Sequence, residues 1–287
     1  MKLIDELIKR FNKKKTIGLA LSGGSTYGAA HIGVLRVLEQ AGIKPDYVTG
    51  TSAGAIIGSA YCAGVPLDEI EQLFLTIGWP TPVKISIHKP RSIFDTQPME
   101  KFLKNKIGDI EFNDLKIPFA AMACDIHTGE RIVLDQGPVA RAVRASAAIP
   151  VLFSPVEIDD RLLVDGGIVD DIPVEHLRTM NTDYIIASDV SRKGKINKKP
   201  DNMFEIMMAM FYIMQDRAAS INEDDCDCYI RPQILQYSPW GFGDAPKMIE
   251  AGRVAAEALL PKLKKDLKLK PTTPGEQIDG IKTNPVQ

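Results

Sequence analysis

The sequence predicts an α/β protein, because short apolar strand-like segments alternate with helical patterns and glycine-rich turns connect them. Residues 16–21 form an apolar run that leads through a glycine loop into a helical pattern. Residues 46–48 lead in the same way through Gly50-Thr51-Ser52-Ala53-Gly54 into a second helical pattern. With 287 residues, the chain is long enough for one large domain with a sizeable core.

The composition is that of a soluble globular protein. Hydrophobic residues make up 45% of the chain, charged residues 25%, and the formal net charge is −2, so no general attraction to nucleic acid is expected. Four scattered cysteines are too few for a disulfide framework and no secretory leader opens the chain, which predicts a reducing, cytoplasmic location. Cys226-Asp227-Cys228 lacks the usual zinc spacing and a nearby histidine, so no metal is predicted.

Residues 47–65 carry no charge, and their number alone is enough for a membrane span. Glycines interrupt this stretch at positions 50, 54, 58 and 64, which makes it a poor helix to face lipid. The same small residues allow close packing against a buried sheet. We therefore predict a strand and a buried helix here and no span.

Within this stretch, Gly-x-Ser-x-Gly between a strand and a helix is the pattern of a nucleophile elbow. A strand that turns directly into a helix forces Ser52 at the apex into a strained backbone conformation, which glycines on either side tolerate. The serine then stands at a helix N-terminus, where unpaired N–H groups favour negative charge. A glycine-lined turn with a chance serine is the plainer alternative.

The earlier loop, Ser22-Gly23-Gly24-Ser25-Thr26-Tyr27-Gly28, opens the first helix and presents free N–H groups suited to a phosphate or an oxyanion. A dinucleotide-binding loop needs a glycine where Ser25 stands and an acidic residue after the next strand, where the elbow lies instead. No cofactor is therefore predicted. His31, among apolar neighbours on the first helix, is expected to be a core histidine.

Further along, helices are expected over residues 67–77, 99–107 and 138–147, and strands over residues 116–124, 131–134 and 182–189. Residues 78–97 lose periodicity and contain several prolines, which is typical of a lid or binding loop. An apolar strand over residues 160–165 presents Asp165, and Gly166 and Gly167 leave its carboxylate unobstructed. Asp-Gly-Gly alone is also a common turn.

Taken together, these motifs resemble the patatin-like phospholipase family over about residues 16–190. The resemblance rests on Leu21-Ser22-Gly23-Gly24, His31-Ile32-Gly33-Val34-Leu35, Gly50-Thr51-Ser52-Ala53-Gly54, Arg144-Ala145-Ser146-Ala147-Ala148-Ile149-Pro150 and Asp165-Gly166-Gly167. It implies a three-layer α/β/α fold with a mainly parallel sheet, and a serine–aspartate dyad that hydrolyses acyl esters of lipids without metal or cofactor.

Carried over to this chain, the resemblance makes Ser52 the nucleophile and Asp165 the base. The oxyanion loop is then formed by Gly23, Gly24, Ser25 and Thr26, with the Ala53 N–H beside it. The glycines that support these motifs are Gly28, Gly50, Gly54, Gly166 and Gly167. The chain departs from the family loop at Ser25, which replaces a third glycine, and at Tyr27, which replaces a basic residue.

Three regions follow from this assignment. Residues 1–15 form an amphipathic helix that docks on the core or on a membrane surface, residues 16–266 form the acyl hydrolase domain, and residues 267–287 form a disordered tail. Lysine clusters in residues 9–15 and 262–270 predict weak, salt-sensitive peripheral binding to the inner membrane surface, with a solvated charge run as the alternative.

The predicted function is hydrolysis of lipid or fatty-acyl esters. Two alternatives stay open: a catalytically weak lipid-binding or regulatory protein, and an acyltransferase. The methionine-rich helix over residues 203–214 is predicted to line or cover an acyl pocket, or else to be an ordinary buried or dimer-forming helix. A triad of Ser52, Asp165 and His176 is disfavoured, because His176 follows Asp165 by only 11 residues within a helical pattern.

Overall fold

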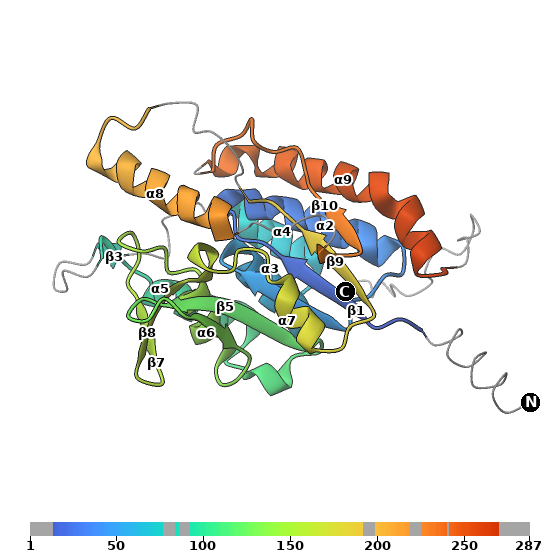
Figure 1. Ribbon diagram of the computed structural model, residues 1–287, viewed down its shortest axis with the longest axis horizontal. Helices are drawn as coiled ribbons and strands as arrows, with labels where there is room; N and C mark the ends of the chain where they lie inside the picture. Colours follow the sequence, from blue (N-terminus) through green and yellow to red (C-terminus); the bar gives the residue numbers. More distant parts are fainter. Residues whose placement is uncertain are drawn as a thin grey trace, which may run out of the picture.

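The computed structural model describes residues 14–76, 84–85, 92–191, 199–218, 225–239 and 241–269. These form a sheet with helices packed on both of its faces (Figure 1). The three-layer α/β/α fold that the sequence predicts is confirmed. Residues 47–65, with their membrane-span length, fold into a strand and a helix of this domain.

The central sheet has the strand order β10-β9-β1-β2-β5-β8-β7, and β6 pairs with β5 outside this path. The four pairings from β10 to β5 are parallel, whereas the pairings of β5 with β6 and β8, and of β7 with β8, are antiparallel. The bounds are β1 Ile17–Leu21, β2 Tyr47–Thr51, β5 Phe119–Asp125, β6 Arg131–Leu134, β7 Val156–Ile158, β8 Arg161–Asp165, β9 Tyr184–Ser188 and β10 Cys228–Ile230. A separate antiparallel pair joins β3 Lys84–Ile85 and β4 Phe94–Asp95.

Most helices agree with the expected segments to within a few residues, whereas α9 was not expected. Their bounds are α2 Ala29–Gln40, α3 Ala53–Ala63, α4 Leu67–Thr76, α5 Gln97–Ile107, α6 Val139–Ser146, α7 Val174–Thr179, α8 Met203–Ala218 and α9 Ala245–Asp266. Short 3-10 turns are η1 Ser25–Gly28, η2 Phe112–Asp114, η3 Gly166–Ile168 and η5 Phe242–Asp244.

The alternation of side chains along β1 separates two cores of different size. Ile17, Leu19 and Leu21 face the larger core, which also contains residues of α2, α3, α6 and α9. Ala20 faces the opposite side and packs with Val174 and Leu177 of α7. Successive strand residues point to opposite faces, so one strand contributes to both layers.

Several predictions fall mostly outside the described residues. The predicted helix over residues 1–15 is described only from residue 14, the lid or binding loop over residues 78–97 only in parts, and the tail over residues 267–287 only to residue 269. The boundaries of the 16–266 domain stay a prediction.

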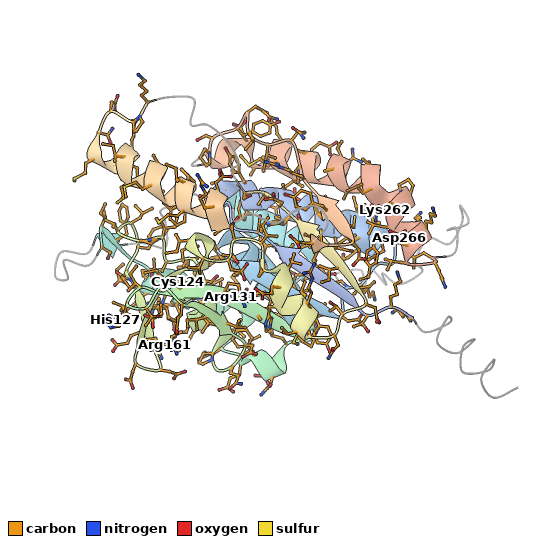
Figure 2. The ribbon with its side chains drawn as sticks, in the orientation of Figure 1. Cys124, His127, Arg131, Arg161, Lys262 and Asp266 are labelled. Carbon is orange, nitrogen blue, oxygen red and sulfur yellow. The ribbon has the colours of Figure 1, made fainter. Side chains whose placement is uncertain are left out.

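In the lysine-rich segment, the ammonium group of Lys262 donates to the carbonyl oxygen of Asp227. It also donates to the Asp266 carboxylate, and this second bond is 2.7 Å long (Figure 2).

Helices α2 and α9 pack side by side on the sheet (Figure 1), and glycines allow their close contact. A Cβ atom at Gly252 of α9 would lie 1.9 Å from the carbonyl oxygen of Ala30, and one at Gly33 of α2 would lie 2.0 Å from that of Ile249. Backbone atoms cannot move aside as a flexible side chain can. The two backbones therefore touch at these glycines.

We expect Gly252→Ala to destabilise the protein by about 2 kcal/mol or more, because overpacking outweighs the gain of about 1 kcal/mol in helix propensity. The free energy of unfolding, measured by urea denaturation, tests this. Gly243→Ala is the matched control, because a Cβ there meets no heavy atom of the described residues within 4 Å. Equal stability of the two variants would contradict the close packing.

Candidate active site

The Gly-x-Ser-x-Gly segment forms the tight turn from β2 into α3. Ser52 has φ 52° and ψ −116°, outside the regions that side chains favour, and it is the N-cap residue of α3. A Cβ at Gly54 would lie 2.2 Å from the carbonyl oxygen of Leu21, so this position requires glycine. The geometry is that of a nucleophile elbow.

Asp165 reaches the same region from an antiparallel strand. Thr51 at the end of β2 pairs with Met122 of β5, and the next residue of β5, Ala123, pairs with Asp165 of β8. Ser52 and Asp165 therefore flank β5 at the same level. Neighbouring strands lie about 4.8 Å apart, so two side chains on either side of one strand can approach each other.

The carboxyl group of Asp165 is completely buried. Its Oδ1 accepts the N–H of Gly167 at 2.8 Å, and its Oδ2 has no hydrogen-bond partner among the described residues. Burial raises the pKa of Asp165 from 3.8 to about 7, while the Gly167 N–H and the neighbouring Ser52 hydroxyl lower it. This carboxyl group is therefore an unusually basic aspartate beside the elbow serine.

The end of α6 and the residues directly after it hold both Ser52 and Asp165. The buried Ser146 hydroxyl accepts the N–H of Ser52 at 3.0 Å, and the carbonyl oxygen of Ala148 accepts the N–H of Asp165 at 2.9 Å. The sequence shows this segment as a motif but indicates no role for it. The only sign in the sequence is the run Ser146-Ala147-Ala148 after an arginine in a helical pattern.

Two N–H groups of the predicted oxyanion loop already have acceptors in this structure. The N–H of Gly23 donates to the carbonyl oxygen of Asp171 at 3.1 Å, and that of Thr26 donates to the carbonyl oxygen of Pro239 at 3.4 Å. Within the described residues, the N–H groups of Gly24, Ser25 and Ala53 make no such backbone bond outside their own helices. Gly24, Ser25 and Ala53 stay predicted oxyanion donors.

The two departures from the family loop are accommodated by the fold. Ser25 has φ 54°, so it keeps the left-handed conformation that glycine adopts most easily. Tyr27 is buried and donates its hydroxyl hydrogen to the carbonyl oxygen of Tyr237 at 2.9 Å. Neither change removes a backbone donor from the loop.

The other predicted supporting glycines lie at points of close contact. A Cβ at Gly28 would lie 2.7 Å from the Cβ of Ala53, and one at Gly166 would lie 2.3 Å from the carbonyl oxygen of Met122. A Cβ at Gly50 would lie 2.6 Å from the carbonyl oxygen of Gly54, whereas one at Gly167 would meet only side-chain atoms, the nearest being Asp171 Oδ1 at 3.0 Å. These contacts bring the loop, the elbow and the turn after β8 together.

A second buried carboxyl group, Asp171, was not predicted. Its Oδ1 accepts the Nε2–H of Gln215 in α8 at 2.7 Å, and its Oδ2 has no partner among the described residues. Burial, with the nearby Asp189 next in importance, raises the pKa of Asp171 well above the usual value. Because its carbonyl oxygen also holds the Gly23 N–H, Asp171 connects α8 to the glycine loop.

The turn after Asp165 is fixed to its neighbours by further polar contacts. Thr51 Oγ1 donates to the carbonyl oxygen of Asp170 at 2.8 Å, and Thr49 Oγ1 donates to that of Pro173 at 2.9 Å. From β6, Arg131 donates to the Asp170 carboxylate at 3.0 Å (Figure 2). The turn is therefore attached to β2 and to β6.

Two of the described histidines, His31 and His176, have surroundings that differ from those of a triad histidine. His31 is a core histidine, as predicted: its Nδ1 bonds Ser188 Oγ at 2.8 Å, its Nε2 bonds the carbonyl oxygen of Ser22 at 3.0 Å, and burial lowers its pKa to about 4. His176 lines a pocket with Val48, near the beginning of β2. Ser52 lies just past the other end of β2, four residues after Val48. Four residues of a strand span about 13 Å.

The structure thus brings an elbow serine, a buried aspartate and a glycine loop together on a three-layer α/β/α fold. The sequence matches the model of the patatin-like phospholipase family over residues 19–178, which is more than half of the chain. This chain belongs to the patatin-like phospholipase family.

Among curated relatives, an uncharacterized NTE family protein of Mycobacterium tuberculosis is 33% identical over 186 residues, which cover 62% of this chain and 50% of that protein. Lysophospholipase nte1 of Emericella nidulans is 29% identical, over 87% of this chain and 18% of that protein. Neuropathy target esterase sws of Drosophila melanogaster is 27% identical, over 86% of this chain and 20% of that protein. The chain thus spans half or less of the length of these relatives.

Among solved structures, VipD of Legionella pneumophila is similar, with a TM-score of 0.51 and 15% sequence identity, over 87% of this chain and 67% of that chain. This similarity concerns the fold. Within the described part of the chain, each helix is too short or too polar to serve as a transmembrane span.

We expect Asp165→Asn to stabilise the protein as the pH rises. In the native state Asp165 keeps its proton up to about pH 7, whereas the unfolded chain loses it near 3.8, so the wild type loses stability between these values. Asparagine does not titrate. The free energy of unfolding of Asp165→Asn should exceed that of the wild type only slightly at pH 4. This difference should grow to roughly 2 to 4 kcal/mol at pH 8.

Urea denaturation at a series of pH values measures this difference. Asp135→Asn, at an exposed position, is the control and should show no such trend. A difference between Asp165→Asn and wild type that stays constant with pH would contradict the buried, basic carboxyl group.

Proposed function

We propose that this protein is a serine acyl hydrolase that cleaves ester bonds of lipids, with Ser52 as the nucleophile and Asp165 as the base. The observation that carries the proposal is the buried Asp165 carboxyl group beside Ser52, with one oxygen unpaired among the described residues. Membership of the patatin-like phospholipase family supports a lipid ester as the substrate.

In the first half of the reaction, Ser52 Oγ attacks the acyl carbonyl carbon and its proton passes to Asp165. The N–H groups of Gly24, Ser25 and Ala53 stabilise the oxyanion. The tetrahedral intermediate then expels the alcohol, which takes the proton from Asp165, and an acyl-serine remains. In the second half, Asp165 accepts a proton from water, the water oxygen attacks the acyl group, and the fatty acid leaves as Ser52 regains its proton.

An aspartate with an ordinary pKa near 4 is a poor base for a hydroxyl group. Burial changes this, because a pKa of about 7 lies near the operating pH, where a general base is most effective. The N-terminus of α3, where Ser52 stands, adds stabilisation of negative charge. A histidine is therefore not required.

The alternatives differ in ways that can be measured. An acyltransferase would use the same acyl-serine but pass the acyl group to an alcohol instead of water. A catalytically weak lipid-binding protein was suggested by the changes at Ser25 and Tyr27, and the retained left-handed loop argues against it. Of the three, hydrolysis is the function that this geometry supports best.

We expect a fluorophosphonate probe to label the native protein and not Ser52→Ala. Asp165→Asn should lose on the order of 10³-fold or more of the esterase activity, as expected for loss of a general base and its alignment. His176→Ala should cost less than about tenfold by the same comparison. The measurements are probe labelling and kcat/KM for an ester substrate.

Two outcomes would contradict the proposal. Absence of labelling in the folded native protein would favour the weak lipid-binding alternative. If His176→Ala were as inactive as Ser52→Ala while circular dichroism showed a native fold, the base would be assigned wrongly.

The acyl chain is proposed to lie against the apolar cluster beside the site. This cluster contains Ile149, Leu152, Phe153, Met208, Phe211 and Tyr212, with Phe94, Ile168 and Met207 packed against it. Ile168 ends η3, the turn directly after Asp165. The predicted methionine-rich helix thus packs its inner face near the site, while Met210 on its outer face is 59% exposed.

We expect Met207→Trp to shift hydrolysis towards shorter acyl chains, because a larger side chain fills space beside the scissile ester. Met210→Trp is the matched control and should leave the profile unchanged. Relative kcat/KM for a series of p-nitrophenyl esters measures the preference. An unchanged profile in a stably folded Met207→Trp would place the acyl chain elsewhere.

A further inference from the structure

Helix α8 is apolar on two opposite sides. Its inner side, with Met208, Phe211 and Tyr212, is buried in the cluster beside the candidate site. Its outer side exposes five large hydrophobic residues, namely Met203, Ile206, Met210, Ile213 and Met214, at exposed fractions between 40% and 87%. A helix that is hydrophobic all round is normally buried, so the outer side calls for a cover.

Exposed apolar side chains continue next to α8. Val151 is 53% exposed and Ile93 is 42% exposed, and the N–H of Ile93 donates to the carbonyl oxygen of Val151 at 3.0 Å. Their chain neighbours Phe94 and Leu152 belong to the same cluster as the inner side of α8. Val151 also has φ 68°, a strained conformation for a β-branched residue.

We propose that the outer side of α8, together with Val151 and Ile93, docks onto the surface of an anionic lipid bilayer. We call these residues the α8 face. The inference rests on the proposed function in one respect, that the substrate is a lipid. It goes beyond it by naming the surface through which the protein reaches that lipid.

The position of α8 favours a bilayer as the occupant. The helix packs against η3, the turn after Asp165, and its Gln215 bonds Asp171 beside the glycine loop. Figure 1 shows α8 lying along one side of the molecule and reaching the end where β3 lies. A bilayer on the α8 face would therefore lie next to the site and leave a short path for an acyl chain.

The sequence before α8 favours an anionic bilayer over a neutral one. Residues 192–199 contain five basic residues and no acidic one. Anionic lipids attract basic residues near the surface, at about 1 kcal/mol per residue.

The form of the helix fits binding at the surface. With 16 residues, α8 is too short to span a bilayer. An interfacial helix buries its apolar side about 5–10 Å into the headgroup region, and it normally turns a polar side to water. Here the opposite side packs on the protein, so no polar side is needed. Methionine side chains adapt to irregular lipid surfaces.

Vesicle flotation tests the proposal in a Ser52→Ala background, so that hydrolysis does not change the lipid. The vesicles contain phosphatidylcholine alone or mixed with phosphatidylglycerol. The test variant carries Met210→Gln and Ile213→Gln. The control carries Ile126→Gln and Val254→Gln, at positions of similar exposure, 47% and 52%, outside the α8 face. We expect the test variant to lose about tenfold or more of its binding to mixed vesicles.

The control should bind like the parent protein. Equal binding of the test variant and the control, or absence of binding by the parent protein, would overturn the proposal. A dimer in sedimentation velocity that only Met210→Gln with Ile213→Gln dissociates would assign the α8 face to a second copy and overturn it as well.

A second readout separates this inference from the proposed function. With Ser52 present, the test variant should hydrolyse a soluble short-chain ester as the wild type does, because the α8 face does not touch the reacting atoms. If the wild type hydrolyses no ester while the loss of vesicle binding is seen, the docking surface stands and the proposed function fails. If the wild type hydrolyses the ester but the parent protein does not bind vesicles, the proposed function stands and the docking surface fails.

Discussion

The removal of the Asp165 carboxyl group from water is the constraint on which the candidate site depends. A buried carboxylate with one backbone donor is poorly stabilised, so the group favours its protonated form up to about pH 7. The fold must hold it there against this cost. It does so by pairing β8 with β5 and by the bond from the Asp165 N–H to the carbonyl oxygen of Ala148.

The same segment holds the strained serine, because Ser146 accepts the Ser52 N–H two residues before Ala148. Strained conformations persist only where the surroundings fix them. Ser52 is fixed by the close contact of Gly54 with β1 and by the hydrogen bond that its N–H donates to Ser146 Oγ. The motif at the end of α6 thus sets the distance between the predicted nucleophile and the predicted base, although it contributes no reacting atom.

Local rules made the elbow, the glycine loop and most helices predictable. Steric limits on a strand-to-helix turn act over five residues, so Gly50 to Gly54 reveal Ser52 without knowledge of the fold. The contact of Ser146 with Ser52 joins residues 94 apart, and that of Gln215 with Asp171 joins residues 44 apart, so no local pattern reports them. The antiparallel direction of β8 and the acceptors that occupy the Gly23 and Thr26 N–H groups depend likewise on tertiary pairing.

Helix α8 shows why one apolar pattern allowed two interpretations. Residues that are apolar at nearly every position give no periodicity from which to choose an inner side, and the fold makes the choice by packing Met208 and Phe211 on the cluster beside the site. The same helix reaches Asp171 through Gln215, and Asp171 holds Gly23 of the loop. A surface that binds the outer side of α8 therefore contacts an element that is bonded, through two hydrogen bonds, to the loop beside Ser52.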